Sequence, residues 1–213
     1  FNSIGGCFMS INLQKGQRID LTKGNAGLNK IYVGLGWDPV ATPSSGGGFF
    51  KSLFGGGGSS QPNIDCDASV IMLKNDKVAN NSDVIFFGNL KSENGAVKHS
   101  GDNLTGAGDG DDEQIVVELQ SIPAEYNRLV FVVNIYDAKG RNQHFGMIQN
   151  AFIRIVNAAN NQELLKYNIS DDYTNQTTLI TGELYRQDNE WKFAAIGTGT
   201  QAGSIREVVE SYK

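Results

Sequence analysis

The sequence is poor in cysteine, histidine and proline. Its two cysteines, Cys7 and Cys66, are too few for a disulfide framework, which fits a reducing compartment. The two histidines, His99 and His144, belong to no zinc or catalytic-triad motif, and we expect both to be surface or hydrogen-bonded structural residues. Only four prolines stand among short, frequent runs of Val, Ile, Phe and Tyr, which favours an all-β chain.

Long hydrophobic runs and an excess of basic charge are also missing. No apolar run is long enough to span a bilayer, and no signal-peptide core precedes the first expected strand. The formal net charge of -5 sits almost wholly in one segment, so we expect no nucleic-acid partner. Met9 reads as a natural start, so we expect residues 1–8 to be an artificial remnant or an upstream extension. Residues 9–213 are then expected to form a single domain.

Short candidate strands recur along the chain with turn residues between them. Some alternate apolar and polar residues, as in residues 113–119, and others are continuous apolar runs. A helix is expected over residues 203–212, with Ile205, Val208, Val209 and Tyr212 on one face, and a turn or two over residues 144–149. The pattern predicts a β-sandwich of two packed sheets with short helices. The expected strands are residues 10–13, 18–21, 30–37, 68–74, 83–88, 113–119, 128–137, 151–158, 163–169, 178–186 and 190–197.

A weak internal repeat accompanies this pattern. KIYVGLGWDP and the later DASVIMLKNDK resemble RLVFVVNIYDA and NAFIRIVNAAN, and each pair is followed by an acidic or polar segment. Two related halves packed face to face would bury a core that neither buries alone. Their acidic loops, residues 101–113 and 170–175, would then gather at one end of the sandwich.

Residues 40–63 interrupt the first copy with glycine and serine tracts around an apolar island, Phe49–Phe54. The tracts are typical of a flexible linker. The segment is either a tolerated loop insertion with a partly collapsed tip, or a tether that docks its phenylalanines onto a partner, a membrane surface or another copy of the chain.

The most informative segment is GDNLTGAGDGDDE, residues 101–113. Five carboxylates lie among four glycines, with no lysine or arginine between them. Carboxylates this close repel one another unless a cation relieves them, and calcium takes roughly 6–8 oxygen ligands. We interpret the loop as a calcium site, with a solvated acidic hairpin loop as the alternative. The candidate ligands are the side chains of Asp102, Asn103, Thr105, Asp111, Asp112 and Glu113 and the carbonyls around Gly106 and Gly108.

A second acidic pair, Asp65 and Asp67, precedes the apolar run ASVIML. On an extended chain both carboxylates face one side while Cys66 faces the other, where we expect it to be a buried apolar residue. Taken alone the pair is explained as turn capping. Together the two clusters hold seven carboxylates, enough for one or two calcium ions.

Other interpretations of these residues fail on spacing or chemistry. The acidic positions do not match an EF-hand register, and Gly106, Gly108 and Gly110 do not match a phosphate-binding loop, which five acids would also repel. A glycosidase needs one carboxyl kept protonated by apolar surroundings, whereas these acids crowd a polar loop. We therefore expect no catalytic role.

Six separated segments, taken in order, resemble the TerD family of bacterial tellurium-resistance and general-stress proteins. They are MSINLQKGQRIDLTK, VGLGWD, DCDAS, GDNLTGAGDGDDE, NAFIRIVN, and GELYR followed by EWKFAAIG. The resemblance implies a calcium-binding β-sandwich with no established enzymatic activity. Carried over by position, the calcium ligands are Asp65, Asp67, Asp102, Asn103, Asp111, Asp112 and Glu113, with backbone oxygens from Thr105 to Gly108.

Two positions depart from the family pattern. Cys66 replaces an apolar residue between the aspartates, and Tyr136 stands where histidine is commoner, which removes a metal role there. The resemblance further implies a cytoplasmic protein that works with other stress-response proteins near the inner membrane; the oligomeric state stays open.

Two functions are compatible with these residues. The first is a non-enzymatic stress-response module that calcium stabilises or switches. The second is a calcium-dependent membrane or ligand adaptor that inserts Phe49–Phe54. Direct capture of tellurite is disfavoured by the acidic site and the shortage of thiols.

Overall fold

A computed structural model describes residues 10–25, 27–39, 64–100 and 110–213. Five of the candidate calcium ligands, Asp102, Asn103, Thr105, Gly106 and Gly108, lie outside these residues, as does the 40–63 insertion. Within the described ranges, no helix is long and apolar enough to cross a membrane.

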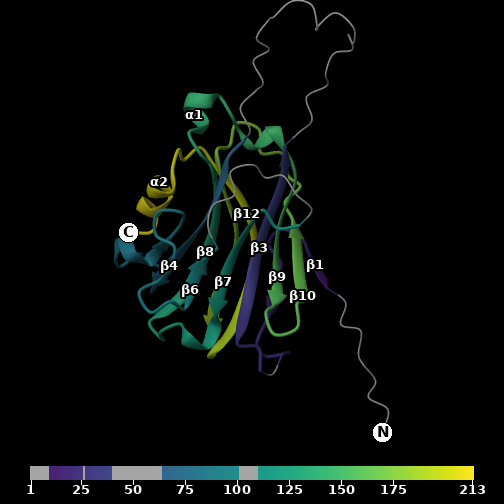
Figure 1. Ribbon diagram of the computed structural model, residues 1–213, viewed down its shortest axis with the longest axis vertical. Helices are drawn as coiled ribbons and strands as arrows, with labels where there is room; N and C mark the ends of the chain where they lie inside the picture. The colour runs from purple at the N-terminus through teal and green to yellow at the C-terminus, as the bar shows by residue number, and fades with distance from the viewer. Residues whose placement is uncertain (1–9, 26, 40–63, 101–109) are drawn as a thin grey trace, which may run out of the picture.

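The described residues form two sheets that pack face to face, as the sequence predicts (Figure 1). In spatial order, the first sheet is β1 (Ile11–Leu13), β10 (Gln162–Asn168), β9 (Ile148–Asn157), β3 (Lys30–Pro39), β7 (Glu113–Glu118) and β6 (Val97–His99). The second is β2 (Arg18–Asp20), β12 (Glu190–Thr200), β11 (Thr178–Gln187), β8 (Tyr126–Ile135), β4 (Cys66–Lys74) and β5 (Val84–Ile85).

Hydrophobic patterning explains which sheet face is covered. β7 alternates, so Ile115 and Val117 enter the core between the sheets while Val116 faces outward. β4 is buried from Cys66 to Leu73 because both of its faces are covered, although it carries Asp67 and Ser69 among its apolar residues. Its even-numbered residues from Cys66 to Met72 join the main core, and Ile71 and Leu73 join a second cluster on the outer face.

That second cluster is closed by α2 (Ile205–Glu210), within the helix expected over residues 203–212. Ile205, Val208 and Val209 are buried against the outer face of β4 and β8, and Tyr212 packs beside them. Figure 1 shows α2 lying along this side of the second sheet, next to the C-terminus. The helical spacing of Ile205, Val208 and Val209 is therefore confirmed, whereas Tyr212 lies in the turn after the helix.

The remaining helical segments are single turns. Residues 144–149 contain one 3-10 turn, η3 (Phe145–Met147), after which β9 begins. Two further turns are η1 (Asn81–Asp83) and η2 (Leu119–Ser121). β6, η1, η2 and α1 (Ala138–Arg141), each of three or four residues, were not predicted from the sequence.

The two halves of the internal repeat are interleaved and do not form separate layers. β3 and its counterpart β8 occupy central positions in opposite sheets, and each pairs with the second strand of the other copy: β3 with β9, and β8 with β4. Each sheet thus takes strands from both halves.

Antiparallel pairing brings the acidic segments to one end of the sandwich, as expected. β3 pairs with β7 and β9, so the end of β3 lies beside their first residues, and the end of β8 lies beside the start of β4. Residues 170–175 follow β10 at the same end, because β10 runs antiparallel to β9. This acidic end, marked by α1, is at the top of Figure 1.

Candidate metal centre

Asp112 joins the exit of the acidic loop to β3. Its backbone N donates to Leu35 O over 2.8 Å, and its Oδ2 accepts a hydrogen bond from Trp37 N at 2.7 Å. The pairing of β3 with β9 shifts register between Gly36 and Asp38. A bulge of this kind leaves one residue outside the regular ladder, and the Asp112 carboxylate satisfies the amide of that residue, Trp37.

Asp111 lies over the outer face of the first sheet, where it is held by an arginine. Arg154 Nε and Nη2 donate to the two carboxylate oxygens of Asp111 at 2.7 and 3.1 Å. Arg154 Nη1 also donates to Glu163 Oε2 at 3.1 Å, and Glu163 Oε1 accepts from Ser10 Oγ at 2.6 Å. A bidentate pair of this kind fixes both position and charge. The Asp111 carboxylate therefore has a counter-charge within the fold.

Two glycines of the VGLGWD segment make room for these contacts. A Cβ on Gly34 would lie 2.2 Å from the Asp111 carboxyl carbon, and one on Gly36 would lie 2.4 Å from the ring of Phe152. Both distances are far inside contact. The glycines in β3 are thus explained by the side chains that lie flat over the strand.

Glu113 points in the opposite direction, into the core, where 2% of it is exposed. Its Oε2 accepts from Ala68 N of β4 at 2.6 Å and lies 3.2 Å from His99 Nε2 of β6. His99 Nε2 is also 3.1 Å from Ala68 O. Glu113 and His99 consequently tie the base of the acidic loop to the second sheet. Both histidines are hydrogen-bonded, since His144 Nδ1 accepts from Gly146 N.

The Asp65-Cys66-Asp67 segment alternates as predicted. Cys66 is fully buried in the core, and Asp67 faces outward beside Asn134, whose Nδ2 lies 3.5 Å from Asp67 Oδ2. Asp67 is nevertheless only 5% exposed. Asp65 lies just before β4, with its Oδ2 at 3.8 Å from Arg141 Nη1.

The two acidic clusters influence the same residues electrostatically. Burial raises the pKa of the Cys66 thiol well above its ordinary value, and Asp67, Asp65, Glu113 and Asp112 raise it further in that order. The clusters that lie far apart in sequence therefore converge around the first residue of β4.

Crowding of this kind raises the pKa of the Asp112 carboxyl group. Burial raises its pKa first; the hydrogen bond from Trp37 N opposes that shift, and the charges of Asp38, Asp111 and Glu113 add to it. Asp38, near the end of β3, was noted from the sequence in the repeat and in the VGLGWD segment, but was not predicted to belong to this site. Its position directly after the apolar strand was the signal that could have identified it.

The described carboxylates do not form a compact ligand cage by themselves. Among the residues that the structure describes, no group of three or more His, Cys, Asp or Glu side chains is close enough to hold a metal ion. Asp111 faces outward on the first sheet, Glu113 faces the core and Asp67 faces outward on the second sheet. Any shared ion would need ligands from residues 101–109.

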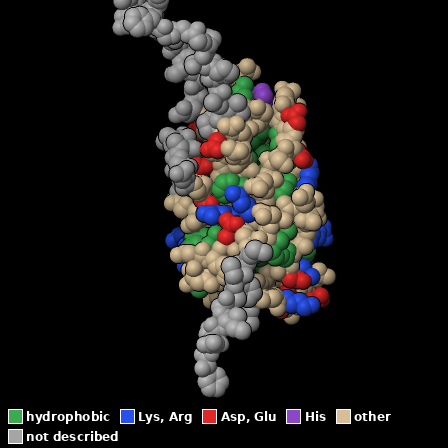
Figure 2. Space-filling model, turned by 90° about the vertical axis from the view of Figure 1, so that its right-hand side faces the viewer, with side chains coloured by type: hydrophobic (Ala, Val, Ile, Leu, Met, Phe, Trp, Pro, Cys, Tyr) green, Lys and Arg blue, Asp and Glu red, His purple; other side chains and the backbone are tan. Residues whose placement is uncertain are grey.

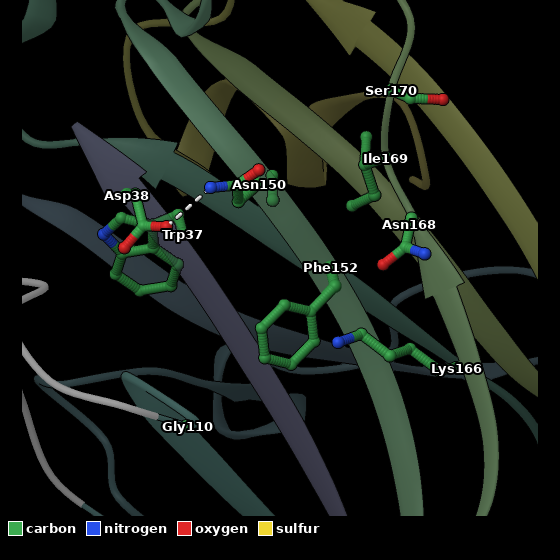
Figure 3. Close-up of a pocket in the computed structure, with 10 residues that line it drawn as sticks. Trp37, Asp38, Gly110, Asn150, Phe152, Lys166, Asn168, Ile169 and Ser170 are labelled. Atoms are coloured by element: carbon green, nitrogen blue, oxygen red, sulfur yellow. Dashed lines mark hydrogen bonds between the residues drawn. The ribbon is translucent and has the colours of Figure 1, made fainter. Parts of the chain in front are cut away.

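A cavity of about 500 Å³ lies beside this centre (Figure 3). Asp38 Oδ2 accepts from Asn150 Nδ2 at 2.9 Å on one side of the cavity. On the other side the Lys166 ammonium lies over the ring of Phe152, 4.0 Å from its centroid. The remaining lining residues are Trp37, Gly110, Ala151, Asn168, Ile169 and Ser170.

The cavity residues of β9 were not predicted, although strand alternation carried a signal for them. Asn150, Phe152 and Arg154 are two residues apart in β9 and share its outer face. Figure 2 shows the side of the molecule on which the β1 edge of the first sheet lies. There, basic and acidic side chains are interspersed and do not gather by sign.

The protein is thus a two-sheet β-sandwich in which carboxylates crowd around the strand ends at the acidic end. The chain belongs to the TerD family, because the model of the TerD domain matches residues 9–212.

Curated relatives cover nearly the whole chain. It is 60% identical to "Stress response protein SCP2" of Bacillus subtilis, over 96% of this chain and 100% of that protein. It is 40% identical to "Tellurium resistance protein TerD" of Serratia marcescens, over 96% of this chain and 97% of that protein. A crystal structure of a TerD homologue from Streptomyces coelicolor has the same fold, with a TM-score of 0.64 at 20% identity; the match covers 88% of this chain and 99% of that one.

Proposed function

We propose that this chain is a non-enzymatic, calcium-binding module of the bacterial stress response. The observation that supports calcium is the state of Asp112. Burial and the charges of Asp38, Asp111 and Glu113 all oppose its ionised form. A hard divalent cation with a preference for oxygen ligands would relieve this cost.

The contacts divide the candidate ligands into two groups. Asp111 and Glu113 contact Arg154 and His99, so they anchor the exit of the loop to the two sheets. Asp112, Asp67 and Asp65, whose Oδ2 lies 3.8 Å from Arg141 Nη1, would share the ion with the loop candidates Asp102, Asn103, Thr105, Gly106 and Gly108. Calcium would supply positive charge and fix the loop, which stabilises the folded state by linkage.

The module would act through partners and not through catalysis. Its relatives are named for stress response and tellurium resistance. In this proposal the protein works in the cytoplasm with other stress-response proteins near the inner membrane, and calcium occupancy changes the rigidity of the surface that they contact.

The test is a calcium titration of the full chain after treatment with a chelator, by calorimetry and by thermal unfolding. We expect one or two bound ions and a rise in melting temperature of about 5–10 °C at free calcium about a hundredfold above Kd. Asp112→Asn should lose most of that rise.

The matched control is Asp188→Asn, which removes the same charge from the exposed turn between β11 and β12. Its calcium response should equal that of the native chain. An unchanged melting curve of the native chain on adding calcium would refute the proposal, as would equal losses in the two variants.

A further inference from the structure

The cavity between the ends of β3, β9 and β10 has the features of a ligand site that does not depend on calcium. We propose that it binds a small anionic polyol, with the anionic group at Lys166 and hydroxyl groups at Asp38 and Asn150. Its volume of about 500 Å³ falls in the range that small-molecule sites occupy.

Lys166 is the reason to expect an anion. Its ammonium is 4.0 Å from the Phe152 ring centroid, and it forms no ion pair with any residue that the structure describes. Other lysines that stack on rings are neutralised. Lys74, over Tyr126, lies 3.5 Å from Glu125, and Lys15, near Tyr173, lies 2.5 Å from Asp171. Lys166 therefore brings an unneutralised charge to a half-buried position.

Phe152 fixes the position of that charge. Gly36 leaves just enough space for the ring, since an added Cβ would lie 2.4 Å from it, and the Lys166 ammonium lies over the ring. The ring is thus wedged against β3 and holds the ammonium by a cation–π contact. Figure 3 shows the nitrogen of Lys166 next to the ring at the edge of the cavity, with Asn168 nearby.

The opposite side of the cavity presents groups that recognise hydroxyls. Asp38 accepts a hydrogen bond from Asn150, so the pair offers a carboxylate acceptor beside an amide. Such a pair can both accept from and donate to a sugar or glycerol hydroxyl. Trp37 and Ile169 supply apolar surface for the carbon skeleton between the two sides. A ligand with hydroxyls at one end and an anion at the other matches this layout.

A phosphorylated polyol has this chemistry and has two sources, a free glycerol or sugar phosphate and the headgroup of a glycerophospholipid. Three soluble probes separate the contributions: sn-glycerol 3-phosphate carries both groups, glycerol carries only hydroxyls, and inorganic phosphate only charge. Vesicles of phosphatidylglycerol, compared with phosphatidylcholine, test the lipid source.

The experiment titrates each probe into the full chain by calorimetry, once with calcium and once with a chelator. We expect sn-glycerol 3-phosphate to bind at least tenfold more tightly than glycerol or phosphate, or the phosphatidylglycerol vesicles to bind in its place. Lys166→Met keeps an unbranched chain over Phe152 and removes the charge; it should weaken binding about tenfold, which corresponds to about 1.4 kcal/mol. Lys166→Arg should restore most of it.

Lys74→Met is the matched control, because it removes another ring-stacked lysine on the second sheet. It should bind like the native chain, and circular dichroism should show both methionine variants folded. Failure of every probe to bind would overturn the proposal, as would equal weakening by Lys74→Met or phosphate binding as tightly as its glycerol ester. One titration series omits calcium. Its result therefore tests ligand binding in the cavity even if the protein does not bind calcium.

Discussion

The outer faces of the two sheets are used in different ways. On the second sheet, Ile71 and Leu73 of β4 are covered by α2, and the contact is apolar. On the first sheet, Gly34 and Gly36 leave space for the ion pair of Asp111 with Arg154 and for the ring of Phe152. Where α2 covers it, the second sheet contributes apolar burial, whereas the first sheet carries a bidentate ion pair and the cavity beside Lys166 on its outer face. Two sheets of similar strand order thus differ in what their outer faces present: apolar burial on one, and an ion pair beside a cavity on the other.

The largest effect should come from the covered face. Ile71→Ala removes a fully buried side chain under α2 and should cost about 2–5 kcal/mol in the free energy of unfolding, measured by urea denaturation. Val116→Ala, at a half-exposed position on the first sheet, should cost less than about 1 kcal/mol. Similar costs for the two variants would mean that the faces do not differ as described.

An intermediate effect should come from the ion pair on the open face. Arg154→Met leaves Asp111, whose side chain is 9% exposed, without its counter-charge, and should cost roughly 1–3 kcal/mol. The comparison is Arg128→Met, because Arg128 pairs with the exposed Asp76 at 3.2 Å and more distantly with Glu183 at 3.6 Å, and neither pair is bidentate. These contacts should contribute at most about 1 kcal/mol. Chemical denaturation of both variants without calcium measures the difference, and a larger loss for Arg128→Met would contradict the assignment.

The smallest effect concerns pH and Asp112. The pKa of Asp112 in the folded state lies above its ordinary value of 3.8, so between these two values the folded state binds more protons than the unfolded state. Stability contributed by this group is therefore lost as pH rises through that window. An asparagine side chain does not ionise, so Asp112→Asn does not lose stability in this way. Its amide oxygen can still accept the hydrogen bond from Trp37 N.

The calcium-free Asp112→Asn variant should consequently be more stable than the native chain at neutral pH and converge with it below pH 3.8. Denaturation in the presence of a chelator from pH 3 to pH 7 measures the difference. The opposite result, a variant that loses stability relative to the native chain as pH rises, would contradict this prediction. It would mean that the hydrogen bond from Trp37 N stabilises the ionised carboxylate more than burial and nearby charges destabilise it.

Much of the fold could be predicted from sequence because its signals are local. The alternation in residues 113–119, the continuous run in β4 and the helical spacing of Ile205, Val208 and Val209 each report directly which faces are buried. β6 and α1 were not predicted: β6 is placed by its pairing with β7, and α1 is bounded by Asp137 and Asn142 in left-handed conformations.

The candidate site was predictable only in part. The density of charge in the sequence identified Asp111, Asp112 and Glu113 as candidates. No local sequence pattern indicates that Arg154 pairs with Asp111 or that His99 contacts Glu113. Those partners come from strands that are distant in sequence, and pairing alone brings them into contact.

By itself the sequence determined the class of fold, the family and the acidic segment whose charges need a partner. It does so because periodicity, composition and motif are properties of neighbouring residues. Only the tertiary structure decided which carboxylates are already paired, which one is crowded, and that Lys166 lies over Phe152 beside a cavity. These contacts depend on which strands lie side by side. Because each sheet takes strands from both halves of the chain, the contacts form only when both sheets have formed.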